Sequence, residues 1–453
     1  MGERVVSTAD AVRTGRASAR EICRDALSRI ADGQQLNAIV SLDAERSLRE
    51  ADAVDARIAS GADLPLAGVP IAVKDLVWVE GRRITQGSRL FAAFVAPCDA
   101  TAIARLKAAG AVVVGIANSS EFGCKGVTAN PLHGATLHPH DRALTPGGSS
   151  GGCASAVAGG LVPAAIGTDA GGSSRRPAAH VGIVGFKPSA GAVPNGPGVP
   201  TLDLGLESLC PMTRDVADAR LVFSVMAGSG TNEREPFPAA ATLAWSPCFG
   251  MDLPIDPEIG ILLDDAIETL RADGLSIERR DPVWPPGADP AALMPLQHAM
   301  LADLYGEAFE QDPALFDPDI AVQIDAGLRL EARAVSRALR LSAAVRLALY
   351  EALAGFDAIL SPTVPCFAWP LDRLGPSHIA GQAVGPRAHA ALTPFANHGG
   401  HPAISLPVGT GSAGLPAGLH LCGRRHGDRR LLDLATRVEA VLGRDGQKRR
   451  LAH

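Results

Sequence analysis

The sequence predicts an α/β protein, and two observations support this class. Short apolar runs alternate along the chain with amphipathic stretches of helical period, which is the order of strands and helices in α/β folds. Of the 453 residues, 47% are hydrophobic and 20% are charged, which is enough apolar material for a large core. No stretch has the composition of a linker between domains, so the whole chain, 1–453, is predicted to form one domain.

The expected elements begin with helices. Ser18 and Glu21 form a capping-box pattern, and a second amphipathic run follows at 43–58, so residues 1–60 are predicted to be a helical lead-in. The apolar run 68–77 is predicted to be a buried strand that ends at Lys74. The other helices are expected at 100–109, 216–226, 257–273, 320–354 and 428–442, and the other strands at 111–115, 356–365, 403–409 and 415–423. Residues 180–189 are expected to form a strand followed by a turn.

Composition excludes several classes of function. A net charge of −6 and 4% aromatic residues give no reason to expect nucleic acid or an anionic membrane as a partner. The eight cysteines are scattered without metal-ligand spacing, which predicts free thiols and neither a zinc site nor a disulfide framework. The first residues lack an apolar leader and no run approaches a membrane span, so the protein is expected to be soluble and cytoplasmic.

The stretch 147–178 contains two glycine clusters, GGSSGG and GTDAGGSSRRPA, around a small apolar segment. Such clusters suit a fold that needs close backbone approach, although a buried helix between two turns is also compatible with them. Gly147 to Gly151 also fits the G-x-S-x-G elbow of α/β-hydrolases, but the preceding HPHDRALTP is not strand-like. A phosphate-binding loop is excluded because no lysine follows the glycines at the required spacing.

With Ser149 and Ser173 lying 24 residues apart and GVPIAVKD upstream, the two clusters resemble the amidase signature family. Further blocks extend the resemblance over nearly the whole chain: DATAIARLKAAGAVVVGIANSSEFG, GIVGFKPSAG, TPFANHGGHPAISLPVG and GLHLCGRRHGDRRLLDLA. The resemblance implies the amidase-signature fold, a large twisted mixed β-sheet flanked by helices on both faces. It also implies a signature core at about 65–215 and a variable, substrate-side region at about 231–380.

Carried over residue by residue, the resemblance implies a Ser-cisSer-Lys triad. Ser173 is the expected nucleophile, Ser149 the bridging serine with a cis peptide bond to Gly148, and Lys74 the base. The backbone N–H groups of four residues are expected to form the oxyanion hole: Ala170, Gly171, Gly172 and Ser173. Supporting roles are expected for Ser150, Asp169 and Arg175, and no metal or organic cofactor is expected.

Elementary chemistry supports this assignment. A serine hydroxyl attacks an amide only when a base takes its proton. Lysine can be that base only in its neutral form, which requires burial to lower its pKa from about 10.4 by several units. Lys74 lies at the end of an apolar run, whereas an arginine there would stay charged.

Arg176 lies three residues after Ser173, and the hypothesis about the substrate's charge is based on it. In malonamidase-like members of the family, an arginine at this position binds the substrate's carboxylate, and a guanidinium suits that role. The sequence therefore favours a small acidic amide, against the alternative of a surface arginine or a local ion pair. GATLHP at 134–139, Leu144 and GIAN at 115–118 depart from the family pattern, which leaves the substrate range open.

The expected function is hydrolysis of the C–N bond of a linear carboxamide through an acyl-enzyme. The first alternative is an amidotransferase A-type subunit that supplies ammonia to a partner in tRNA-dependent amidation. The second is a degenerate, non-enzymatic member, which the presence of all three triad residues disfavours. The expected partner is a small-molecule amide; an ester or a urea derivative fits the same chemistry, and the oligomeric state, a homodimer included, stays open.

Overall fold

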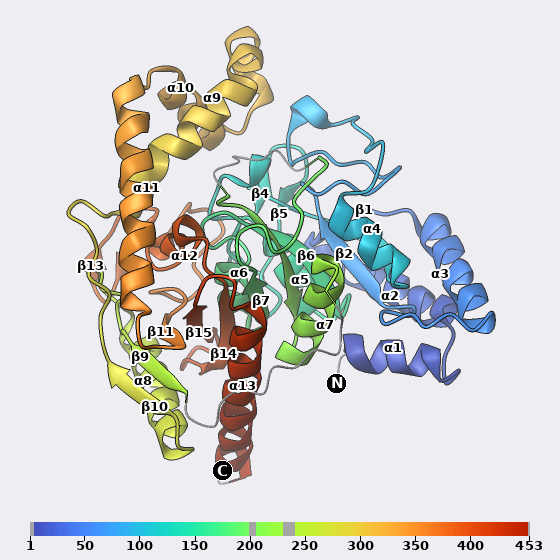
Figure 1. Ribbon diagram of the computed structural model, residues 1–453. Helices are drawn as coiled ribbons and strands as arrows, with labels where there is room; N and C mark the ends of the chain where they lie inside the picture. Colours follow the sequence, from blue (N-terminus) through green and yellow to red (C-terminus); the bar gives the residue numbers. More distant parts are fainter. Residues whose placement is uncertain (1–3, 199–204, 230–240, 452–453) are drawn as a thin grey trace.

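Eleven strands form one mixed β-sheet through the centre of the molecule (Figure 1). The computed structural model describes residues 4–198, 205–229 and 241–451, so the start of the expected substrate-side region, 231–240, lies outside the described residues. Across the sheet the strand order is β1-β3-β2-β6-β8-β7-β14-β15-β11-β9-β10. The strands are β1 (Ile39–Ser41), β2 (Pro70–Lys74), β3 (Val112–Ala117), β6 (Ala164–Asp169), β7 (Val184–Lys187), β8 (Ser208–Thr213), β9 (Thr242–Trp245), β10 (Ser276–Arg279), β11 (Ala358–Pro362), β14 (Ala403–Thr410) and β15 (Pro416–Gly423).

Pairing in the sheet is parallel in two places and antiparallel elsewhere. Strand β2 runs parallel to β3 and β6, and β9 runs parallel to β10 and β11, while β8, β7, β14 and β15 pair with their neighbours in antiparallel fashion. The mixed sheet expected from the sequence is thereby confirmed. Because β2 and β6 are parallel neighbours, their carboxyl ends meet at one edge of the sheet. Two small hairpins lie outside it, β4 (Ala129–Asn130) with β5 (Gly134–Ala135) and β12 (His378–Ile379) with β13 (Gln382–Ala383).

Helices cover both faces of the sheet, as expected. Each face has its own set of buried aliphatic side chains, so the sheet separates two apolar layers. One layer packs beneath α1 (Val5–Arg13), α4 (Thr101–Ala108), α7 (Val216–Ala227), α8 (Pro257–Ala272) and α13 (Asp428–Leu451). The other packs beneath α2 (Ala19–Asp32), α3 (Ala44–Ala59), α5 (Gly151–Ala158) and α6 (Arg175–Val181).

The local signals in the lead-in produce the helices that they predict. The Ser18 hydroxyl accepts a hydrogen bond from the Glu21 N–H, and the Glu21 carboxylate accepts one from the Ser18 N–H, so both halves of the capping box are formed. Asp43 caps α3 in the same way by accepting from the Arg46 N–H at 3.0 Å.

Several elements differ from the expectation. The segment expected as a strand and turn at 180–189 begins as the last turn of α6, and its middle forms β7. The segment expected to be helical at 320–354 forms two helices: α10 (Pro318–Leu328) packs on α9 (Met294–Gln311), and α11 (Ala332–Ala352) packs on α9 and on α12 (Pro394–Gly399). Helix α9 (Met294–Gln311) was not anticipated, and with α10 and α11 it forms the helical part at the top of Figure 1.

No helix in the described part of the chain is both long and apolar enough to cross a membrane. All eight cysteines are free thiols, as the sequence predicts.

Candidate active site

Lys74 ends strand β2 and is fully buried. Its Nζ donates to the Ser149 Oγ at 2.7 Å and to the Thr168 Oγ1 at 2.9 Å. Burial lowers the pKa of Lys74 to about 8, against the opposing effect of nearby groups, of which the Glu207 carboxyl is the strongest. The side chain is therefore held between two hydroxyls with a reduced affinity for its proton.

Ser149 lies directly before α5, and its peptide bond to Gly148 is cis. The Thr128 hydroxyl lies against this turn: it donates toward the carbonyls of Gly147 and Ser149, at 2.9 and 3.2 Å, and accepts from the Gly151 N–H at 2.8 Å. A side chain at Gly148 would clash with the backbone of 126–127, which explains the glycine there. The first glycine cluster thus presents the Ser149 hydroxyl to Lys74.

Ser173 follows the loop that leaves β6 and is 8% exposed. The Ser150 N–H donates to its carbonyl at 3.1 Å, which joins the two glycine clusters. Gly172 has φ +111°, and a Cβ there would stand 2.0 Å from the Thr393 Oγ1, so only glycine fits before the serine. No hydrogen bond joins the Ser149 and Ser173 hydroxyls in the described part of the chain, but both serines line the same pocket.

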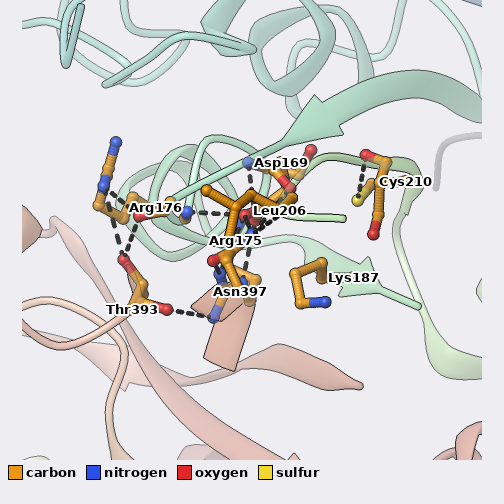
Figure 2. A network of polar contacts seen from close by, with 12 residues as sticks. Asp169, Arg175, Arg176, Lys187, Leu206, Cys210, Thr393 and Asn397 are labelled. Carbon is orange, nitrogen blue, oxygen red and sulfur yellow. Dashed lines mark hydrogen bonds and ion pairs between the residues drawn. The ribbon is translucent and has the colours of Figure 1, made fainter. Parts of the chain in front are cut away.

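A buried ion pair fixes the second cluster (Figure 2). The Arg175 guanidinium donates to both Asp169 carboxylate oxygens at 2.9 and 3.0 Å, and also to the Thr393 carbonyl and the Asn397 Oδ1. Burial alone would raise the pKa of Asp169, but Arg175, Lys187 and Asn397 together outweigh burial and hold that pKa well below its usual range. The predicted supporting residues Asp169 and Arg175 therefore connect the end of β6 to α12.

Ser150 also lies where a supporting residue was predicted. Its hydroxyl donates to the Thr168 carbonyl at 3.1 Å and accepts from the Thr168 N–H at 3.3 Å. The residue therefore ties the start of α5 to the end of β6, next to both serines.

Arg176 is 7% exposed and does not line the pocket that contains Ser173. Its guanidinium donates to the Gly171 carbonyl at 2.6 Å and the Gly148 carbonyl at 3.3 Å, which spans the two glycine clusters. Burial lowers the pKa of Arg176 to about 10. The proposed contact with a substrate carboxylate stays a prediction, and in this structure the guanidinium has backbone partners instead.

The four predicted oxyanion donors differ in their availability. The Gly172 N–H donates to the Asp169 Oδ1 at 2.6 Å and is therefore occupied. Within the described residues, the N–H groups of Ala170, Gly171 and Ser173 have no hydrogen-bond partner. Ala170 and Ser173 also line the pocket, so these donors lie beside the space that a reacting carbonyl would occupy.

The pocket lies at the carboxyl ends of β2 and β6 and has a cavity volume of about 40 Å³. Ser149, Thr168 and Ser173 form its floor, and α9 forms one wall. The lining from outside the two glycine clusters consists of Phe122, Gly123, Cys124, Glu207, Gln297, Met300, Leu304 and Tyr305.

Several of these positions were not found by reasoning from the sequence. Thr168 stands beside Asp169 in the second cluster, and the hydroxyl next to the glycines was the available signal. Asn397 donates to the Asp169 carbonyl at 2.8 Å, although the two residues lie 228 positions apart in the sequence. Nothing local in the sequence indicates this contact. Glu207 precedes β8 without a motif that marks it.

Comparisons with known proteins identify the family of this chain. The family model described as Amidase matches residues 21–432. The A-type subunit of glutamyl-tRNA(Gln) amidotransferase from Roseiflexus sp. (strain RS-1) is 31% identical over 473 residues, covering 95% of each chain, and relatives from Deinococcus radiodurans and Chromohalobacter salexigens carry the same name. The Chromohalobacter match, 45% identical, covers 48% of this chain and 45% of the relative.

Solved structures give the same result. A crystal structure of an amidase superposes with a TM-score of 0.89 at 30% identity, covering 97% of this chain and 99% of that one. A bacterial aryl acylamidase of the amidase signature family superposes with a TM-score of 0.86 at 26% identity, covering 97% and 96%. The chain therefore belongs to the amidase signature family.

Proposed function

We propose that this protein cleaves the C–N bond of a carboxamide through an acyl-enzyme formed on Ser173. The observation that carries the proposal is the 2.7 Å hydrogen bond between the Lys74 Nζ and the Ser149 Oγ, at the floor of a pocket that Ser173 also lines. A serine attacks an amide when a base takes its proton, and here a buried amine can act as that base through a second hydroxyl.

In the first step the Ser173 Oγ attacks the amide carbonyl while its proton passes to the Ser149 Oγ. Ser149 passes its own proton to the neutral Nζ of Lys74, so one proton enters the relay and one base accepts it. The carbonyl oxygen takes the negative charge and lies against the free N–H groups of Ala170, Gly171 and Ser173.

In the second step the tetrahedral intermediate collapses and the C–N bond breaks. The proton held on Lys74 returns through Ser149 to the departing amine, which leaves as ammonia or a primary amine. Water then attacks the ester on Ser173 by the same relay and releases the carboxylic acid, which restores the free enzyme. Every proton taken up in the attack is given back.

A second candidate shares this chemistry and differs in the fate of the ammonia. The relatives with similar sequences reported above carry the name of the A-type subunit of glutamyl-tRNA(Gln) amidotransferase, and the match to the Roseiflexus protein spans 95% of both chains. This observation favours an amidotransferase component, in which glutamine is cleaved at Ser173 and a partner protein uses the ammonia. The structural neighbours, which include an amidase and an aryl acylamidase, support hydrolysis of a free amide.

Ammonia release from the purified chain tests the proposal. We expect the chain to release ammonia from simple amides, hydroxylamine to intercept the acyl-enzyme as a hydroxamate, and Ser173→Ala to abolish both. The exposed serine variant Ser60→Ala is the matched control and should retain activity. Full activity in Ser173→Ala would refute the mechanism.

The same assay separates the two candidates. Hydrolysis of butyramide by the chain alone supports an amidase. Ammonia release that is restricted to glutamine as substrate, and that begins only after partner proteins and tRNA are added, supports the amidotransferase. A small carboxamide substrate and a cytoplasmic location are parts of this proposal that rest on the sequence, and the proposal is compatible with a homodimer.

A further inference from the structure

Glu207 places a carboxylate in the pocket where the proposed reaction occurs. It is the one carboxylic acid among the pocket-lining residues that the structure describes. The backbone around it is fixed: the Glu207 carbonyl accepts from the Asn195 Nδ2 at 2.8 Å, and the Leu206 carbonyl accepts from the Asn397 Nδ2 at 3.0 Å. The backbone that carries this carboxylate is therefore anchored in part by the same asparagine that contacts Asp169.

The N–H and O–H donors of Gln297 and Tyr305 in the pocket wall already donate to other groups of the protein. The Gln297 Nε2 donates to the Cys124 carbonyl at 3.3 Å and to the Gln323 Oε1 at 2.5 Å. The Tyr305 hydroxyl donates to the Gln86 Oε1 at 3.2 Å. Toward a substrate, this wall therefore offers the acceptor oxygens of Glu207 and the apolar surfaces of Met300 and Leu304, and no cation.

The charge on Glu207 has no direct cationic partner. No lysine or arginine in the described part of the chain lies within 4.0 Å of its carboxylate. The group that lowers the pKa of Glu207 most is Lys74, which donates to the Thr168 hydroxyl at 2.9 Å, and Thr168 has the next largest lowering effect. Burial raises the pKa of Glu207, whereas Lys74 and Thr168 lower it, with Asp169 adding a smaller upward effect.

During the proposed reaction, the Glu207 carboxylate has even less positive charge nearby. Lys74 must be neutral to accept the proton of Ser149, and in that form it no longer compensates a carboxylate. A buried charge without a partner is costly, so the pocket is complementary to a substrate that brings a positive charge. A bound cation also disfavours the ammonium form of Lys74, so binding such a substrate promotes the neutral amine that the relay needs.

We infer that Glu207 recognises the substrate, and that the preferred substrates are carboxamides whose non-reacting part carries an ammonium or another N–H donor. The inference rests on the proposed cleavage at Ser173 and adds the substrate class. This inference favours a substrate with a positive charge, whereas the hypothesis on Arg176 favours a substrate with a negative charge. One panel of substrates therefore decides between the two.

Three amides of matched size form this panel. β-Alaninamide carries an ammonium, butyramide has a methyl group in its place, and succinamate carries a carboxylate. We expect kcat/KM of the wild type to be highest for β-alaninamide and lowest for succinamate. In Glu207→Gln the ratio of β-alaninamide to butyramide should fall by about tenfold or more, the size expected for losing a charge-assisted hydrogen bond.

Two further variants control for indirect effects. Glu307→Gln removes the same charge from the exposed face of α9 and should leave the ratio unchanged. Glu207→Asp keeps the charge with a shorter reach and should recover part of the preference. A thermal unfolding curve for each variant confirms that the proteins compared are folded.

The remaining outcomes overturn the inference. An unchanged ratio in Glu207→Gln, a wild-type preference for succinamate, or an equal loss on all three amides would each refute it, the last because it places the effect on Lys74 and not on the substrate. The proposed function fails separately, when cleavage of these amides does not depend on Ser173.

Discussion

The protonation of Lys74 gives the sharpest test of the mechanism. Burial lowers the pKa of its amine to about 8. At pH 7 such a lysine is ~9% neutral, whereas a lysine at its ordinary pKa of ~10.4 is ~0.04% neutral, a difference of ~230-fold in available base. Because only the neutral amine accepts the proton of Ser149, kcat/KM should rise about tenfold per pH unit and level off above about pH 8.

Substitution at Lys74 tests the same reasoning. Lys74→Arg keeps a permanent charge and Lys74→Met removes the amine at similar length, so both should lower kcat by about 10²–10⁴. Lys107→Arg, at a lysine paired with Asp99 at 2.7 Å, is the matched control and should behave as the wild type. The assay is ammonia release from a neutral amide between pH 5 and 10. An activity profile that is already level at pH 6, or a Lys74→Met protein with more than a tenth of wild-type activity, would refute the assignment.

Three further predictions follow from the contacts around the two serines. Ser149→Ala should lower kcat by about 10²–10⁴ and leave thermal stability near that of the wild type, because the relay hydroxyl is lost while the fold is kept; pre-steady-state kinetics would detect the slower acylation. Asp169→Asn should lower the free energy of unfolding by about 3–5 kcal/mol, measured by urea titration, because Arg175 loses its buried carboxylate; a loss under about 1 kcal/mol would contradict this role. Arg176→Ala should raise KM for succinamate far more than for butyramide if its guanidinium binds a substrate carboxylate, and an equal effect on both would leave it only the contacts with the glycine loops.

The positions of Lys74 and the two serines could be predicted because each is marked locally. Lys74 ends a short apolar run, which forms a strand, and a charge at the carboxyl end of a buried strand lies at the edge of the sheet. Ser149 and Ser173 stand in glycine clusters. Such clusters mark backbone conformations and close approaches that few other residue types tolerate. These local features single out the segments, whereas the roles of the three residues come from the resemblance to the family and stay predictions.

The walls of the site could not be predicted in the same way. Helix α9 borders a pocket, so Leu304 remains 46% exposed and the helix lacks the one-sided apolar pattern by which helices are recognised. Asn397 and Thr393 reach the second glycine cluster only after the sheet has brought α12 beside β6. The charged position of Arg176 suggested a ligand, but the closeness of two backbone carbonyls depends on the three-dimensional path of both loops.

The polar network around Arg175 can form only late in the synthesis of the chain, because its members lie far apart in the sequence. Its guanidinium contacts the Asp169 carboxylate six residues away, but also the Thr393 carbonyl and the His420 Nε2, more than 200 residues later. A nascent chain on the ribosome therefore contains both serines long before it contains the groups that hold their loop in place. Competence for the reaction arrives only with the final segments of the polypeptide, so an incomplete product released early would lack a braced nucleophile.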